Sequence, residues 1–252
     1  MKCLFGFVVA VLVGQLGFAQ PVEFVPFVQT APRVDGKGTD AAWAAATWQP
    51  LAHLWAGVPA AESDLSARYK VVAARDALYV LAEVTDDTLA DTHASPSDRY
   101  WDDDCLEIFV DPDASGGGHQ YNHQAFAYHL GLAGEVMDLG TDERPISLPS
   151  HVQFKRVTQG RTSVWECRVS LYDSTFEQRR AGQVPMMLAP GLTLGFALAY
   201  CDNDHSLERE TFLGSMPIDG PDKNRAWIDA GLFTRLTLKA VPVPKTTSKP
   251  RR

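Results

Sequence analysis

The densest run of chemically useful side chains in the sequence begins at Trp101 and ends at Glu107. Trp101 precedes three successive aspartates, and Glu107 follows them inside an apolar run. A flat aromatic face edged by fixed polar groups suits a sugar ring, which has apolar faces and hydroxyl edges. Aspartate oxygens are also the hard ligands that calcium takes. The run therefore predicts binding of a sugar, a cation or both.

An extended strand over residues 105–111 is expected to position these side chains, because the run is apolar and Pro112 ends it. Side chains alternate along a strand, so the aliphatic residues at the even positions share one face, which is a core face. Cys105, Glu107 and Phe109 share the opposite face. A glutamate in mid-strand is either a solvated edge residue or a buried functional one, and both interpretations stay open.

The pattern Trp-x-x-Asp-x-x-Glu-Ile-Phe-Val-Asp, which begins at Trp101, resembles the central strand of family 9 carbohydrate-binding modules. These are β-sandwich domains often attached to secreted xylanases. The resemblance spans residues 32–238. Four further segments are similar to the family in the expected order: residues 34–43 with Val-Asp-Gly, Asp40 and Trp43; residues 78–86 with Leu-Tyr-Val; residues 195–209 with Gly-Phe, Asp-Asn-Asp and Arg209; and Trp227 ahead of Phe233.

The resemblance implies a site in which Trp101 and Trp227 clamp one sugar ring. Glu107 would accept hydrogen bonds from the sugar hydroxyls. The other motif tryptophan, Trp43, and the strand residue Trp165 are expected in the core, where this residue type is common. The ligand-binding residues expected from the resemblance are Trp101, Glu107, Trp227, Asn203, Arg209 and His129.

The sequence departs from the family at two binding positions. The family's sugar-binding arginine and glutamine fall at Ala127 and Ala199. Gln124, His129 and Asn203 lie near these positions and could replace the missing groups. The expected fold survives these losses, but the family's sugar preference does not transfer.

Three aspartates from two loops, Asp102, Asp104 and Asp202, are the expected ligands of a structural calcium ion, as in some family members. Their spacing does not follow an EF-hand loop, so a solvated acidic loop is the alternative. No organic cofactor is expected.

The distribution of charge excludes some partners. Formal net charge is −8, yet without Lys2 and the four basic tail residues the body carries 18 basic and 31 acidic groups. Such a body repels nucleic acid and anionic membranes. The expected partner is therefore a neutral oligo- or polysaccharide, bound by a monomer.

The N-terminus has the features of an export signal. Lys2 precedes an apolar run that ends in Gly-Phe-Ala, which predicts a signal peptide over residues 1–19 and a secreted or periplasmic location. An uncleaved anchor is the alternative, although the run is short for a membrane span.

Three cysteines would remain after cleavage at the predicted site: Cys105, Cys167 and Cys201. All lie in apolar runs, which favours buried thiols without an obligatory disulfide framework. One disulfide with one free thiol stays open. Spacings of 62 and 34 residues match no zinc-ligand pattern.

Many short apolar runs separated by turn residues predict an all-β fold, an antiparallel β-sandwich of immunoglobulin or jelly-roll type. One or two short helices are expected, one of them over the alanine-rich residues 39–46. No repeat or change of composition divides residues 20–240, which we interpret as one domain. Residues 241–252, rich in Pro, Lys and Thr, are expected to form a disordered basic tail.

Together these features predict a secreted, non-catalytic carbohydrate-binding protein that supports polysaccharide breakdown. A carbohydrate-active hydrolase is one alternative, with Glu107 and either Asp104 or Asp202 as an acid–base pair. A haem-binding sandwich module of an electron-transfer system is the other, with Met137 or His129 as axial ligand. Motifs of serine hydrolases, phosphate-binding loops and zinc proteases are absent from the sequence.

Overall fold

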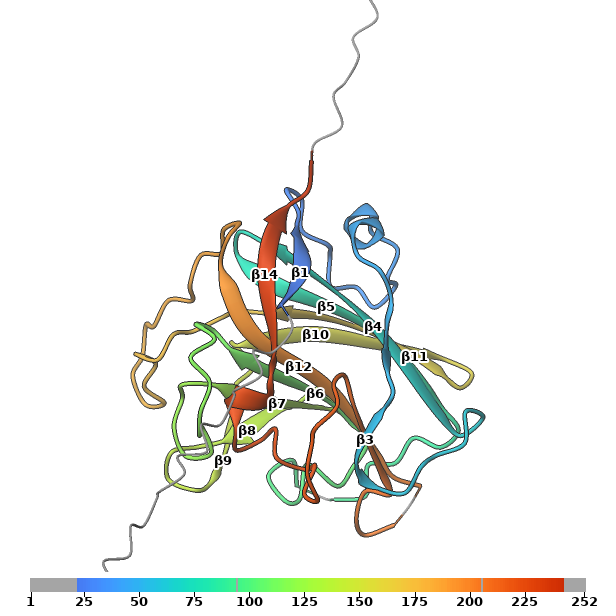
Figure 1. Cartoon of the computed structure of the whole chain (residues 1–252). Coiled ribbons are helices and arrows are strands. Elements are labelled where there is room, and N and C mark those ends of the chain that lie inside the picture. The colour runs from blue at the N-terminus through green and yellow to red at the C-terminus, as the bar shows by residue number, and fades with distance from the viewer. Residues whose placement is uncertain (1–21, 94, 205, 243–252) are drawn as a thin grey trace, which may run out of the picture.

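The computed structural model describes residues 22–93, 95–204 and 206–242, and within these ranges the chain is almost entirely strand and loop (Figure 1). The predicted signal peptide and nearly all of the predicted tail lie outside the described residues. The strands are β1 (Val22–Phe27), β2 (Gln49–Leu51), β3 (His53–Gly57), β4 (Leu65–Ala74), β5 (Ala77–Asp86), β6 (Cys105–Asp111), β7 (Phe126–Gly131), β8 (Val136–Leu139), β9 (Pro145–Ser147), β10 (Val152–Gln159), β11 (Thr162–Val169), β12 (Thr193–Asp202), β13 (Thr211–Gly214) and β14 (Thr234–Ala240).

The strands form one continuous mixed sheet in the order β10-β11-β5-β4-β1-β14-β12-β6-β7-β8-β9. Strand β13 pairs with β12 and β3, and β2 pairs with β4. The expectation of an all-β fold is confirmed, but the expected all-antiparallel pairing is wrong for β1, which runs parallel to both β14 and β4. The first strand inserts between the last strand and β4, and the long connection from β1 to β4 permits a parallel neighbour.

One apolar core lies between the two halves of this sheet. The inner faces of β4, β5 and β11 contribute Val71, Val80 and Trp165 to the same buried cluster as Ile108 of β6 and Leu198 of β12. Figure 1 shows the β4–β5–β10–β11 half lying over the β6–β7–β12 half. The predicted core positions of Trp165 and Trp43 are confirmed, since their exposed fractions are 0% and 3%.

Strand β6 has the bounds and the two faces that the sequence predicts. Its even-numbered aliphatic residues lie in the main core. Cys105 and Phe109 lie in a second cluster on the other face, which also contains Phe212 and Phe233. Glu107, between them, is 2% exposed, so it is not a solvated edge residue. A buried carboxylate of this kind needs partners.

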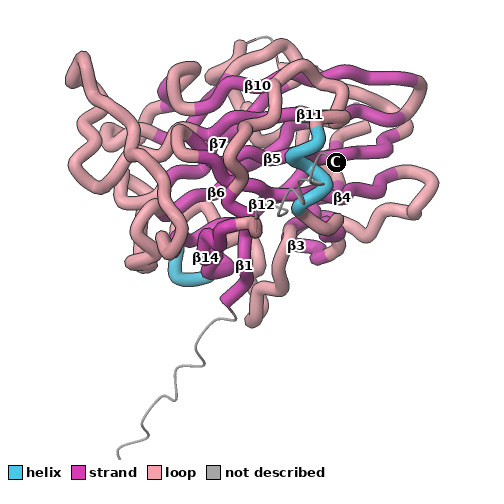
Figure 2. The backbone as a smooth tube through the Cα atoms, turned by 90° about the horizontal axis from the view of Figure 1, so that it is seen from above, coloured by secondary structure: helices cyan, strands magenta, loops and turns pink. Residues whose placement is uncertain are grey.

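Among the residues that the structure describes, helix is confined to two short 3₁₀ segments, η1 (Ala41–Ala45) and η2 (Ala230–Leu232), drawn in cyan in Figure 2. The helix expected over residues 39–46 is therefore present, but it is shorter and tighter than an α-helix. A run this short cannot meet the cost of nucleating an α-helix, and the buried Trp43 fixes it against the sheet instead. No helix within the described ranges has the length and hydropathy to cross a bilayer.

A buried carboxylate on β11 anchors the loop before η1. Oε2 of Glu166 accepts hydrogen bonds from the backbone amides of Asp35 (3.0 Å), Gly36 (2.7 Å) and Lys37 (3.2 Å), and Oε1 accepts from Trp43 Nε1 (3.0 Å). Gly36 has φ +78°, and a Cβ there would lie 2.5 Å from a methyl of Val157. The Val-Asp-Gly…Trp pattern is thus a fold motif.

We expect Glu166→Gln to lower the free energy of unfolding by about 1–3 kcal/mol, because one acceptor oxygen becomes an NH₂ group facing a buried donor. Glu83→Gln is the matched control, since its partner Arg68 is half exposed and an exposed ion pair contributes about 0–1 kcal/mol. Urea unfolding of both variants measures the difference. An equal effect in the two variants would show that Glu166 has no anchoring role.

Candidate functional site

A pocket of about 450 Å³ opens on the face of β6 that carries Glu107. Its walls come from β6, β7, β8, β13 and five loops, and its size is that of a small-ligand site. The lining residues are Tyr100, Trp101, Glu107, Phe109, His119, Gln120, Tyr121, Asn122, Ala125, Ala127, His129, Asp138, Leu139, Glu143, Arg209, Phe212, Asn224 and Trp227.

Two half-exposed tryptophans line this pocket from separate loops. Trp101 is 39% exposed and Trp227 is 37% exposed, in contrast to the buried Trp43. The Trp101 ring packs edge-to-face on Tyr100 with centroids 5.0 Å apart, and Trp227 Nε1 donates to Asn224 O at 3.1 Å. Both rings are therefore held in place while a large apolar face stays open to a ligand.

Glu107 forms the polar floor of the pocket. Its Oε1 accepts hydrogen bonds from His129 Nε2 (3.1 Å), Arg209 Nη1 (3.4 Å) and the Cys201 thiol (2.9 Å). Burial alone would raise the pKa of Glu107, but the charges of His129 and Arg209 and these hydrogen bonds lower it below its ordinary value. Among the described residues Oε2 has no hydrogen-bond partner, so it can accept from a ligand.

Arg209 and His129, which contact Glu107 at the floor, are themselves fixed. The guanidinium of Arg209 lies 4.1 Å from the centroid of the Phe212 ring and also donates to the sulfur of Cys201 at 3.2 Å. The ring of His129 packs edge-on against Tyr100, with centroids 4.7 Å apart. The floor therefore offers one free acceptor beside a rigid donor pair, which is an arrangement suited to a hydroxyl-rich ligand.

Five of the six ligand residues expected from sequence line the pocket, and Asn203 does not. Asn203 is 0% exposed, and its side-chain amide donates to the backbone oxygens of Asp102 and Ser206. It fastens one loop to another, which leaves no group for a ligand. Of the three candidate substitutes for the missing family residues, only His129 lines the pocket, and Ala127 lies beside it.

Several polar lining residues escaped the sequence analysis. Gln120, Tyr121 and Asn122 follow the glycine turn after β6, and Glu143 and Asn224 come from two other loops. Tyr121 is 45% exposed and adds a third open aromatic ring. The one sequence signal for these residues is an exposed aromatic between amides in a turn, which is too common to identify a site.

The predicted calcium ligands are brought together only in part. Asp104 and Asp202 lie with Asp86, all at most 3% exposed, with carboxylate oxygens within 4.8 Å of one another. Asp102 lies apart, because its carboxylate pairs with Arg99 at 2.8 Å. Asp86, at the end of β5, is the member that the sequence analysis missed. A second group of Asp64, Asp87 and Asp204 has the same spread of oxygens.

The buried carboxylate cluster is chemically suited to a hard cation. Burial and the neighbouring Asp86 raise the pKa of Asp104 to about 9, and the same two causes raise that of Asp202 to about 7. Three carboxylates this close cannot all ionise without a compensating positive charge. The residues therefore fit a calcium ion, which takes oxygen ligands.

The two rival functions find less support in this geometry. Asp104 and Asp202 do not line the pocket that Glu107 lines, so neither can share a substrate with it there. His129 and Met137 are direct cross-strand partners on β7 and β8. Directly paired side chains point to the same face of a sheet, so these two cannot together be the opposite axial ligands of one haem, while haem binding through either one alone stays an alternative.

Comparison with known protein families gives one match over most of the chain. The family described as "Carbohydrate family 9 binding domain-like" matches residues 34–241. No curated protein matches the chain.

Similar solved structures include a family 9 carbohydrate-binding module from Caldicellulosiruptor kristjanssonii, seen in complex with cellotriose and with glucose. Its cellotriose complex has a TM-score of 0.63 at 19% identity, covering 92% of this chain and 100% of that chain. The glucose complex has the same TM-score and identity, covering 89% and 100%. A putative carbohydrate-binding protein from Bacteroides uniformis gives 0.56 at 16% identity, covering 88% and 100%. On the family match, which extends over most of the sequence, the chain belongs to the carbohydrate family 9 binding domain-like proteins.

Proposed function

We propose that the protein is a non-catalytic carbohydrate-binding protein that holds a neutral sugar between Trp101 and Trp227. One observation carries the proposal: two half-exposed indoles flank a pocket whose floor is a fixed carboxylate, one oxygen of which has no partner among the described residues. The indoles cover the apolar faces of a pyranose ring, and Oε2 of Glu107 accepts hydrogen bonds from its hydroxyls.

A neutral glucose-type ligand fits the chemistry best. The acidic body disfavours anionic sugars, while Arg209 and His129 are already paired with Glu107. Similar structures contain glucose and cellotriose, which supports the same class of sugar. With the expected signal peptide, the protein would act outside the cytoplasm, as a monomer that assists polysaccharide breakdown.

We also propose that calcium occupies the cluster of Asp86, Asp104 and Asp202 and has a structural role. Asp104 accepts from the amides of Ala90 (2.7 Å) and Asn203 (2.8 Å), so it joins the loop before β6 to the segment after β12. A cation there would hold the loop that carries Trp101 without touching the ligand.

We expect Trp101→Ala and Trp227→Ala each to weaken binding of the best sugar from a glycan array roughly tenfold, since each ring contributes on the order of 1–3 kcal/mol. Stability should change little, because both rings are more than a third exposed. Isothermal titration and a urea melt separate the two effects.

Trp43→Ala is the matched control for this experiment. Its ring is 3% exposed, so the substitution should cost about 3–5 kcal/mol of stability through the cavity it leaves, with the affinity unchanged. If Trp101→Ala and Trp227→Ala behave like Trp43→Ala, the clamp is wrong. Release of reducing sugar from a bound oligosaccharide would favour the hydrolase instead.

A further inference from the structure

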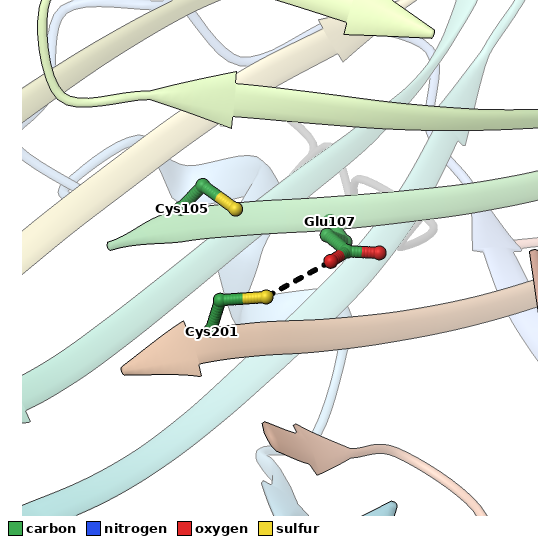
Figure 3. A group of neighbouring side chains, drawn as sticks. All are labelled: Cys105, Glu107 and Cys201. Carbon is green, nitrogen blue, oxygen red and sulfur yellow. Dashed lines mark hydrogen bonds between the residues drawn. The ribbon is translucent and has the colours of Figure 1, made fainter. Parts of the chain in front are cut away.

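Two buried thiols lie behind the floor of the pocket. Cys105 on β6 and Cys201 on β12 are direct cross-strand partners, and both are free cysteines. Cys105 and Glu107 are two residues apart on one strand, so they share a face. Figure 3 shows the two sulfur atoms and the Glu107 carboxylate gathered between β6 and β12, where the Cys201 thiol donates a hydrogen bond to Oε1 of Glu107.

These three side chains have the donors and the spacing of a metal site. One sulfur from each cysteine and one oxygen of Glu107 all lie within 4.8 Å of one another. A tetrahedral zinc ion holds sulfur at about 2.3 Å and carboxylate oxygen at about 2.0–2.2 Å. Small side-chain movements would therefore bring all three donor atoms to bonding distance from one ion. The sequence spacing hides this set, because its ligands come from two strands that meet only in the fold.

His129 lies beside this set, against Glu107, with the orientation of a metal-binding histidine. Its Nδ1 lies 3.0 Å from the carbonyl oxygen of Ala127, and its Nε2 lies 3.1 Å from Oε1 of Glu107. A ring with its hydrogen on Nδ1 donates to that carbonyl and presents the Nε2 lone pair to the cluster. A backbone carbonyl that fixes the tautomer in this way is the usual outer contact of a ligating histidine.

The charges at the cluster balance around a divalent ion. Two thiolates and one carboxylate carry three negative charges, and the adjacent Arg209 guanidinium, 3.2 Å from the Cys201 sulfur, offsets one of them. A divalent cation neutralises the remaining two. Arg209 also donates to a sulfur, as donors around thiolate-bound metals do.

We propose that Cys105, Cys201 and Glu107, with His129 as the fourth ligand, bind a thiophilic divalent cation such as Zn²⁺. Burial raises the pKa of both thiols, so the metal-free cysteines are protonated. Each equivalent of metal therefore displaces one proton from each thiol as the two metal–sulfur bonds form, and His129 releases the Nε2 proton that it donates to Glu107 as the metal–nitrogen bond forms. Glu107 and Arg209 line the pocket, which gives the ion its route of entry.

If the protein binds a sugar as proposed above, metal binding would also affect the sugar site. The ion would bind a carboxylate that the sugar also uses, and it would withdraw negative charge from the pocket floor. Zn²⁺ should therefore weaken sugar binding, and the sugar should weaken Zn²⁺ binding by the same factor.

Titration of the reduced full chain with Co²⁺ tests the metal site directly. We expect one equivalent with thiolate-to-metal absorption, displaced by Zn²⁺ but not by Ca²⁺, which prefers oxygen ligands. Cys105→Ala and Cys201→Ala should each weaken binding by about a hundredfold or more, because loss of even an outer partner costs about 10–100-fold. The matched control is Cys167→Ala, which removes the buried thiol of β11, outside the cluster.

Three results would overturn the metal site: no thiolate absorption in the unmodified chain, equal loss in Cys167→Ala, or a Cys105–Cys201 disulfide in protein isolated without reductant. The last is sterically allowed, since cross-strand partners have Cα atoms about 4.5–5.5 Å apart, within the range of a disulfide. Absorption of the unmodified chain tests the site even if a variant fails to fold. If Co²⁺ binds but no sugar binds the metal-free protein, the proposed function fails and the metal site stands.

Discussion

Glu107→Gln is expected to weaken sugar binding by about a hundredfold, the largest effect of any single change in the pocket. The amide keeps the size of the side chain but removes the charge that pairs with His129 and Arg209. It also puts an NH₂ group either against those two donors or in the place of the free Oε2 acceptor. The hydrogen bond from a sugar hydroxyl to the charged Oε2 acceptor is worth about 1.5–3 kcal/mol, and its loss accounts for the expected fall in affinity.

Isothermal titration measures the loss of affinity, and Glu143→Gln is the control for it. Glu143 also lines the pocket but is exposed, so its charge is screened by water and its replacement should change the affinity by less than about threefold. Unchanged affinity in Glu107→Gln would show that the sugar binds outside this pocket. A similar loss in both variants would show that only the net charge of the pocket matters.

Features with a period of two were predictable from the sequence, because each residue of a strand faces one of two sides. The two faces of β6 follow from this alternation, whereas the core positions of Trp43 and Trp165 were expected because tryptophan is commonly buried. The same alternation put Glu107 on the face that forms the floor of the pocket.

The walls of the pocket were not predictable, because they depend on a contact between distant loops. Gly118 and Asp229 form an isolated bridge, and His119 N donates to Ile228 O at 3.0 Å. This contact places the loop of Tyr121 beside the loop of Trp227. Nothing in either segment alone indicates the other, just as nothing in β1 indicates its parallel insertion.

The three successive aspartates show why adjacency in sequence misled the prediction of metal ligands. They lie in a turn, where neighbouring side chains diverge. Asp102 pairs with Arg99, Asp103 accepts from the backbone of Thr92 at 2.7 Å, and only Asp104 points into the buried carboxylate cluster. The third carboxylate of the cluster comes from Asp86, on a strand end that the fold brings near.

Calcium is expected to raise the melting temperature by an amount that grows with pH. Without a cation, the raised pKa values of Asp104 (about 9) and Asp202 (about 7) mean that the native state prefers the protonated acids. Their contribution to stability is then complete below about pH 4 and is lost as the pH rises through about 7 and about 9. A bound cation favours the ionised acids and removes this loss.

At pH 5 the calcium-loaded and chelated proteins should therefore melt at similar temperatures. At pH 8–9, with calcium at about a thousand times its dissociation constant, the loaded protein gains about 4 kcal/mol, which is about 8–16 °C for a domain of this size. Differential scanning calorimetry across this pH range measures both quantities. Asp104→Asn should abolish the difference, whereas Asp102→Asn should keep it, because Asp102 lies outside the cluster. Coincident melting curves with and without chelator at pH 9 would show that calcium does not bind at this site.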